Sequence, residues 1–158
     1  ELLLKGEVKI GNAVVKIPLL KPEKGDNLAL IKQLSLEEIK INCTALFSLS
    51  QVILAAKAGS RYVSVFAGRI DDEGGDYYQV VADCVEFLER SWARREGTAE
   101  CELIVGSVRT VGNVLDCERA GAHIVTVTPE VLSKMLEHKF SRFTVEQFEA
   151  DAKKLKGG

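Results

Sequence analysis

Five short apolar runs of β type alternate with segments of helical periodicity along the 158-residue chain. The runs recur at spacings of about 20 to 40 residues, which is typical of repeated βα units whose strands pair in parallel. They span residues 13–17, 40–45, 62–67, 100–105 and 122–127. The alternation predicts an α/β fold with a parallel sheet, which is either doubly wound or part of a (β/α)₈ barrel.

The residues expected to end strands, cap helices and form loops lie at regular places between these runs. Pro18 is expected to stop the first strand because it cannot donate to a sheet ladder. Asp26 is a predicted helix N-cap, and an acidic loop over 68–76 is expected after the third strand. The predicted helices are the end of one helix over 1–9 and then 26–34, 48–58, 77–95, 110–120, 129–138 and 144–155. No internal repeat or low-complexity linker interrupts the pattern, so a single domain over 1–158 is expected.

Composition narrows the functional classes. The net charge is -2, so nothing indicates binding to nucleic acid or to an anionic membrane surface. No apolar run approaches the roughly 20 residues needed to span a bilayer. The four cysteines are scattered without a CxxC pair, which predicts buried free thiols in a reducing, cytoplasmic setting. Two histidines far apart do not make a metal cluster, and no glycine-rich dinucleotide or P-loop motif is present, so no cofactor is expected.

One residue of the first run stands out chemically. Lys16 lies within the apolar stretch 13–18, where an unpaired ammonium group costs several kcal/mol unless its pKa falls. A lysine with a lowered pKa is a nucleophilic amine that forms Schiff bases with carbonyl substrates. The alternative is a strand whose lysine side chain points outward into water.

Polar side chains also gather where the later strands end. In a parallel βα fold, functional groups collect at the carboxyl ends of the strands. Beside Lys16, the residues at these positions are Asn42, Thr44, Ser64, Phe66, Arg69, Ser107 and Arg109. Arginines with hydroxyl neighbours make a reasonable phosphate pocket, because the guanidinium fork matches phosphate oxygens.

Each of these residues also has a purely structural explanation. Asn42 and Thr44 can satisfy backbone groups, and Phe66 can be an ordinary core residue. Arg69 can form a surface ion pair with the acidic residues that follow it, which would contribute little to stability. The residues after the fourth strand can be loop residues without a ligand. Tyr77 and the neighbouring tyrosine are expected to pack as helix residues.

Taken together, the chain resembles the transaldolase family, including its short branch and the related fructose 6-phosphate aldolases. The matching segments, in order and at compatible spacings, are 14–18 (VVKIP), 41–48 (INCTALFS), 62–72 (YVSVFAGRIDD), 105–109 (VGSVR) and 120–129. The resemblance implies a parallel (β/α) barrel of the TIM type that lacks its first three βα units. The chain is therefore expected to be incomplete at its N-terminus.

The same resemblance implies roles for individual residues. Lys16 is the Schiff-base lysine on the fourth barrel strand, and Thr44 helps to position a proton-shuttling water. The residues expected to contact the substrate are Asn42 and Ser64 at the dihydroxyacetone unit, and Arg69, Ser107 and Arg109 at the phosphate. Phe66 is also expected to contact the substrate. The transaldolases that the chain resembles carry phenylalanine at this position, whereas the aldolase branch carries a tyrosine that assists proton transfer.

The implied activity is transfer of a dihydroxyacetone unit between sugar phosphates. The strands expected to be missing carry the family's catalytic aspartate, an asparagine, and the glutamate that works with Thr44. Two alternatives stay open: a fructose 6-phosphate aldolase, and a non-catalytic phosphosugar-binding or assembly half-barrel. A homo-oligomer is expected, because five strands leave two barrel edges that a protein must cover or pair.

Overall fold

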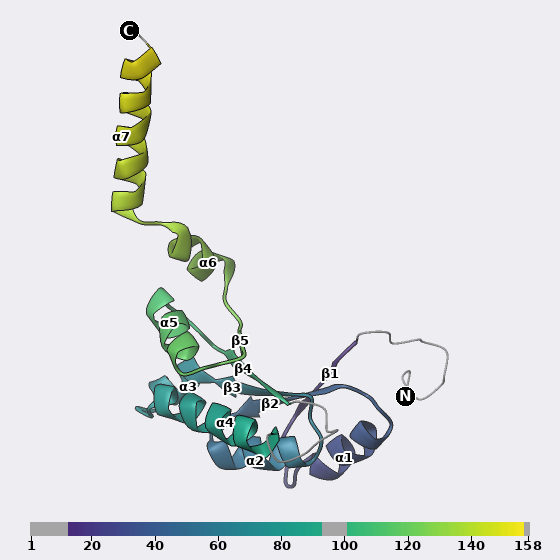
Figure 1. Ribbon diagram of the computed structural model, residues 1–158. Helices are drawn as coiled ribbons and strands as arrows, with labels where there is room; N and C mark the ends of the chain where they lie inside the picture. Colours follow the sequence, from purple (N-terminus) through teal and green to yellow (C-terminus); the bar gives the residue numbers. More distant parts are fainter. Residues whose placement is uncertain (1–12, 93–100, 157–158) are drawn as a thin grey trace.

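Five parallel strands form one sheet in the order in which they occur along the chain (Figure 1). The computed structural model describes residues 13–92 and 101–156. The strands are β1 (Val15–Pro18), β2 (Ile41–Leu46), β3 (Tyr62–Phe66), β4 (Glu102–Gly106) and β5 (Ile124–Val125). A doubly wound sheet reverses its strand order at a switch point, and this sheet does not. The barrel-type alternative is therefore confirmed.

Helices follow the strands in the alternation that the sequence predicts. They are α1 (Leu28–Leu36), α2 (Leu49–Lys57), α3 (Ala67–Asp72), α4 (Tyr77–Trp92), α5 (Val111–Arg119), α6 (Pro129–Leu136) and α7 (Lys139–Lys156). Figure 1 shows α1, α2 and α4 along one side of the sheet, whereas α7 extends well away from it. Within the described residues, none of these helices is both long and apolar enough to cross a membrane.

Side-chain caps explain several helix ends. The Ser48 hydroxyl accepts the Gln51 N–H at the start of α2, and Gly59 follows the helix with a φ of 104° that favours glycine. The prediction that Asp26 is the N-cap of the first helix is wrong by one residue, because Asn27 holds that position. Asp26 nevertheless accepts the Leu28 N–H at 3.0 Å, so its carboxylate satisfies a free donor of the first turn.

The core lies between the helices and one face of the sheet. Alternate strand residues are buried there, and the set comprises Ile17, Ile41, Cys43, Val63, Val65, Leu103 and Val105. Because successive side chains of a strand point to opposite faces, the residues between them lie on the other face. Those residues are mostly exposed or half-buried, with the buried Ser64 and Gly106 as exceptions. The sheet is thus apolar toward the helices and more polar on its opposite face.

Two predicted segments are corrected by the structure. Residues 68–72 belong to the short helix α3 and not to a loop, because Ile70 packs into the core and Gly68 lies directly against the backbone of Ser107. The last helix begins at Lys139, five residues before the predicted start, and the fifth strand shortens to Ile124–Val125. The predicted helix over 1–9 and the last residues of 77–95 lie outside the described residues.

All four cysteines are buried and free, as their scattered positions predict. Burial raises the pKa of Cys84 and Cys101 to about 12, and that of Cys43 and Cys117 to about 11. The neutral thiol is therefore the stable form of each at physiological pH. Since the thiolate is the nucleophile, these side chains behave as small core residues.

We therefore expect the folded chain to react slowly with a thiol-specific disulfide reagent at pH 8 and to expose all four thiols on unfolding. Folding also holds these protons more tightly than the unfolded chain does, so stability should fall as pH rises from 9.0 toward about 12. Thiol titration with and without urea measures the first effect, and urea unfolding at pH 8 and 10 measures the second. Rapid modification of the folded chain at pH 8 would contradict the burial described here.

Candidate functional site

The polar face of the sheet brings three predicted site residues into adjacent positions. Lys16 of β1 pairs in register with Asn42 of β2. Ser64 of β3 donates its hydroxyl hydrogen to Asn42 Oδ1 at 2.7 Å, although 22 residues separate the two in the chain. Parallel pairing therefore assembles an amine, an amide and a hydroxyl across three consecutive strands. Because Ser64 is buried, its hydrogen bond fixes the Asn42 amide in one orientation.

Lys16 adopts the second of the two arrangements that the sequence leaves open. Its side chain is exposed and not buried within the apolar run. The flanking residue Ile17 is buried instead, because it points toward the helices. The apolar run thus reflects the covered face of an edge strand, and the lysine occupies the open one.

Thr44 lies two residues beyond Asn42 and next to an irregularity of β2. The register of β2 with β3 shifts between Cys43 and Leu46, and Ala45 has a φ of 59°. A non-glycine residue in this left-handed region is strained by about 1–3 kcal/mol, so the surrounding pairing must hold it there. Thr44 Oγ1 is buried and makes no hydrogen bond to any described residue. Its hydrogen-bonding capacity is therefore unused within the described part of the chain.

An aromatic side chain and an arginine continue the face past the end of β3. The Phe66 ring is half-buried and packs edge-on against Phe47, with 5.9 Å between the ring centroids. The guanidinium carbon of Arg69 lies 5.6 Å from the Phe66 ring centroid, which is a cation–π distance. Phe66 is thus neither a fully buried core residue nor free of neighbours, and it holds an exposed arginine beside it.

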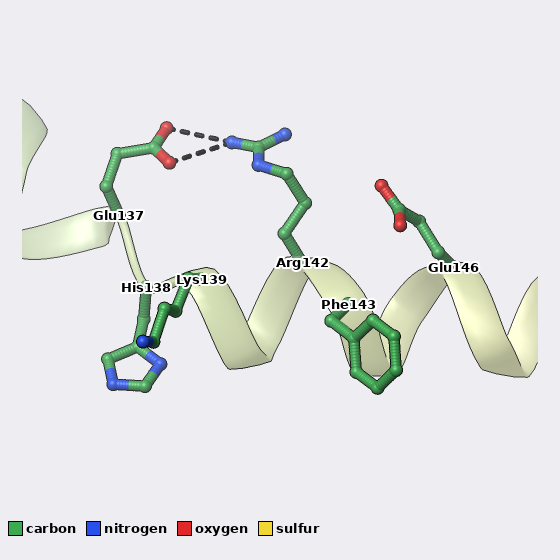
Figure 2. A pocket seen from close by; sticks show the side chains of 6 residues that line it. All are labelled: Glu137, His138, Lys139, Arg142, Phe143 and Glu146. Atoms are coloured by element: carbon green, nitrogen blue, oxygen red, sulfur yellow. Dashed lines mark hydrogen bonds and ion pairs between the residues drawn. The ribbon is translucent and has the colours of Figure 1, made fainter.

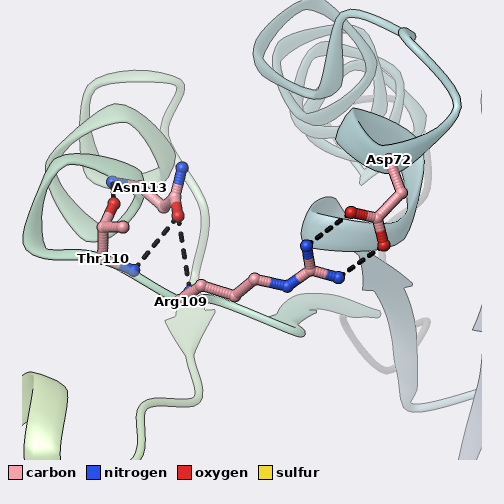
Figure 3. Close-up of polar contacts among 4 residues, drawn as sticks. All are labelled: Asp72, Arg109, Thr110 and Asn113. Atoms are coloured by element: carbon pink, nitrogen blue, oxygen red, sulfur yellow. Dashed lines mark hydrogen bonds and ion pairs between the residues drawn. The ribbon is translucent and has the colours of Figure 1, made fainter.

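Arg109 forms the main ion pair of this region, and its partner is Asp72. Its Nη1 and Nη2 donate to the two carboxylate oxygens of Asp72, each at 2.5 Å (Figure 3). The hydrogen bonds from Arg109 lower the pKa of Asp72 and raise the pKa of Arg109 itself. The surface-pair alternative that sequence suggests for Arg69 is therefore found at Arg109, which the fold brings from 37 residues away.

Gly68 is a residue of this site that sequence reasoning missed. Its N–H donates to the Ser107 carbonyl at 3.1 Å, so the start of α3 lies directly on the loop that follows β4. A Cβ at Gly68 would lie 2.2 Å from that carbonyl oxygen and 2.9 Å from both Ser107 Oγ and Arg109 Nε. Ser107 also has a φ of 60°. The only signal in the sequence was a glycine placed immediately before an arginine.

A separate hollow lies at the junction of α6 and α7 (Figure 2). It is formed by exposed side chains, with the Glu137 carboxylate paired to Arg142, and its lining residues are Glu137, His138, Lys139, Arg142, Phe143 and Glu146. It lies on the helices that leave the sheet, away from the ends of β1 to β4. No group of three or more metal-ligating side chains is found among the described residues.

A sequentially ordered parallel sheet with a lysine on its open face defines an α/β protein of the barrel type. The comparison with protein families identifies it further. Residues 3–157 match the model of the family described as Transaldolase/Fructose-6-phosphate aldolase, and the chain belongs to this family. The resemblance noted in the sequence is thereby confirmed.

Relatives and solved structures agree with this placement. The chain is 38% identical over 145 residues to a probable transaldolase of Nitrosopumilus maritimus, covering 92% of this chain and 61% of the relative. It is 40% identical over 140 residues to probable transaldolase 1 of Listeria monocytogenes, covering 89% of this chain and 61% of the relative. The chain thus spans about three fifths of the length of these curated relatives.

A crystal structure of an IMP dehydrogenase/GMP reductase-like protein from Corynebacterium glutamicum is similar to this chain with a TM-score of 0.55. The sequence identity is 17%, and the match covers 75% of this chain and 34% of the other. At this level of identity the likeness concerns the fold alone. It agrees with the barrel-type arrangement of the five strands.

The contact between Gly68 and Ser107 is directly testable. Gly68→Ala places a methyl group against the Ser107 carbonyl, so it should lower the free energy of unfolding by about 1–3 kcal/mol. Gly112→Ala is the matched control, because its Cβ would meet only Thr110 Oγ1 at an ordinary 3.6 Å. Urea unfolding measures both variants. Equal stability of the two would show that the loop yields freely at this contact.

Proposed function

We propose that the chain supplies the Schiff-base part of a transaldolase, which transfers a dihydroxyacetone unit between sugar phosphates through Lys16. The observation that carries the proposal is the adjacency of Lys16, Asn42 and Ser64 on the open face of the sheet in a chain of this family. A Schiff base needs an amine that a carbonyl substrate can reach, and the exposed Lys16 meets that requirement.

In the proposed reaction, neutral Lys16 attacks the C2 carbonyl of a ketose phosphate, and loss of water gives an imine. The imine withdraws electrons, so the C3–C4 bond breaks, a proton leaves the C4 hydroxyl, and an aldehyde phosphate departs. The remaining enamine adds to an acceptor aldehyde phosphate, which takes up a proton at its carbonyl oxygen. Water then hydrolyses the new imine and frees the lysine.

The neighbouring residues support these steps. The Asn42 amide, held by Ser64, is placed to orient the hydroxyl groups of the dihydroxyacetone unit. The buried Thr44 hydroxyl has no partner among the described residues, so it can hold the water that carries protons. Arg69, Ser107 and Arg109 would bind the phosphate at the ends of β3 and β4. The proposal requires no metal or organic cofactor.

Borohydride trapping with fructose 6-phosphate tests the reaction at Lys16. Peptide mass spectrometry should find the reduced dihydroxyacetone adduct on Lys16, and Lys16→Met should abolish it. Lys57→Met is the matched control, because Lys57 is also exposed but lies on α2. An unmodified Lys16, under conditions that trap a full-length relative, would overturn the proposal and leave a phosphosugar-binding module as the better description.

The need for an acceptor aldehyde distinguishes a transaldolase from the aldolase alternative. A transaldolase releases little free dihydroxyacetone unless an acceptor is absent and water intervenes, whereas an aldolase turns over on fructose 6-phosphate alone. Phe66 favours the transaldolase, because the aldolase branch that the sequence resembles carries a tyrosine there. Product analysis with and without an aldehyde phosphate distinguishes the two.

We also propose that the protein assembles with further copies of itself, in the cytoplasm. Support comes from α7, whose apolar side chains are exposed: Phe140, Phe143, Val145, Phe148 and Leu155. A monomer rarely leaves so many large apolar residues along one helix uncovered. The edges of β1 and β5 are also unpaired within the described part of the chain.

Sedimentation equilibrium should therefore give a mass that is a multiple of 17.3 kDa. Phe148→Asp should shift the equilibrium toward the monomer, because it places a charge on the apolar side of α7. Gln147→Asp is the control, since it adds the same charge at a neighbouring polar position. A monomeric unmodified chain at micromolar concentration would contradict the assembly.

A further inference from the structure

Arg109 is held at both ends by side chains of neighbouring helices (Figure 3). At its backbone, the N–H donates to Asn113 Oδ1 at 3.4 Å. At its tip, both terminal nitrogens donate to the carboxylate of Asp72 at 2.5 Å. The contacts come from two elements, α5 and α3, so the loop after β4 is tied to both of its neighbours.

The path of the Arg109 side chain between these ends brings it close to Ser107. The site that a Cβ of Gly68 would occupy is 2.9 Å from Arg109 Nε and 2.9 Å from Ser107 Oγ. Two hydrogen-bond donors of different residues therefore converge beside the α3 backbone. Gly68 permits this approach because it has no side chain of its own.

The pairing with Asp72 leaves part of the guanidinium group unused. Arginine has five N–H donors in a fixed plane, and the end-on pair with Asp72 uses one from each terminal nitrogen. Among the described contacts, no acceptor takes the Nε–H or the outer hydrogens of the terminal nitrogens. One edge of the fork can thus bind a second oxyanion while Asp72 holds the end.

Asn113 is itself fixed by its neighbours. Its Oδ1 also accepts the Thr110 N–H at 3.1 Å, and its own N–H donates to Thr110 Oγ1 at 3.1 Å. Its Nδ2 donates at 2.9 Å to the hydroxyl of Tyr77, which in turn donates to Asp116 at 3.0 Å. These hydrogen bonds restrain the segment that follows Ser107, a residue with a left-handed φ of 60°.

Stability alone does not account for the Asp72 pair. Both side chains are about half exposed, at 50% and 53%, and exposed ion pairs contribute little to folding. A carboxylate beside an anion-binding arginine also repels the anion, so Asp72 weakens binding unless this cost is offset by the orientation that it gives to the arginine. The geometry therefore calls for a role in positioning.

We propose that Asp72 and Asn113 are positioning residues that hold Arg109 so that its free edge and the Ser107 hydroxyl face the phosphate group of one substrate. The proposal extends the function proposed above, because it depends on the phosphate being bound at Ser107 and Arg109. Neither Asp72 nor Asn113 contacts the substrate in this arrangement. Each acts through Arg109.

The effect of removing the Asp72 charge on substrate binding distinguishes a positioning role from simple repulsion. If Asp72 only repels the phosphate, Asp72→Asn should strengthen binding of fructose 6-phosphate. If Asp72 positions Arg109, the same variant should weaken binding, on the order of tenfold, the scale on which orienting residues act in metal sites. Asp71→Asn is the matched control, since it removes an adjacent charge that has no hydrogen bond to Arg109 among the described contacts.

The experiment is calorimetric titration of the full 158-residue chain with fructose 6-phosphate, inorganic phosphate and fructose. Asp72→Asn and Asn113→Ala should weaken the binding of fructose 6-phosphate and of inorganic phosphate and leave the binding of fructose unchanged. Asp71→Asn should not weaken the binding of any of the three. Asp72→Glu, which keeps the carboxylate, should restore part of the affinity. Thermal unfolding checks whether Asn113→Ala is folded. If it is not, the Asp72 variants alone test the proposal, because Asp72 is half exposed.

Unchanged or stronger phosphate binding by Asp72→Asn overturns the proposal, as does failure of the unmodified chain to bind either phosphate probe. Borohydride trapping on the same samples separates this outcome from failure of the proposed function. If Lys16 is trapped but Asp72→Asn binds phosphate as the unmodified chain does, only the positioning proposal is refuted. Weakened phosphate binding without any adduct at Lys16 would refute the Schiff-base function and leave positioning intact.

Discussion

Parallel pairing of β1 to β4 is the interaction on which the rest of the molecule depends. Because side chains alternate across a strand, the pairing places Val63 and Leu103 under the helices and turns Lys16, Asn42 and Ser64 to the other face. Parallel sheets are normally covered on both faces, so a face that carries an amine and amide groups needs a reason other than packing. A polar substrate is such a reason.

Two of the three non-glycine residues with a left-handed φ among the described residues lie beside candidate site residues, and the third, Glu38, lies between α1 and β2. Ala45 and Ser107 both have left-handed φ values, one beside Thr44 at the shift of β2 and the other at the end of β4. Such residues persist only where surrounding contacts hold them, and they gather at functional sites. The close contact of Gly68 with the Ser107 backbone is one of those contacts. Strain and close approach thus meet at the expected phosphate position.

Apolar alternation and turn residues are local signals, so they predict the α/β fold and the order of its elements. The choice of a barrel over a doubly wound sheet comes from the family resemblance. The sequence does not predict the partner of Arg109, since the sequence neighbour of Asp72 is Arg69 and only the sheet brings Arg109 across from 37 positions away. It leaves the burial of Lys16 open, because an apolar run looks the same on a covered central strand and on a strand with one open side. Gly68 escapes notice for a similar reason: its close contact exists only after β3 and β4 pair.

The position of Lys16 on β1 links its chemistry to assembly. β1 is an edge strand of the described sheet, so its outer N–H and C=O groups lack a strand partner there. Any segment that pairs with this edge removes water from one flank of the lysine. Covering the edge and enclosing the nucleophile would then be one event. An uncovered edge leaves the Lys16 side chain open to water, even with Asn42 and Ser64 already in place.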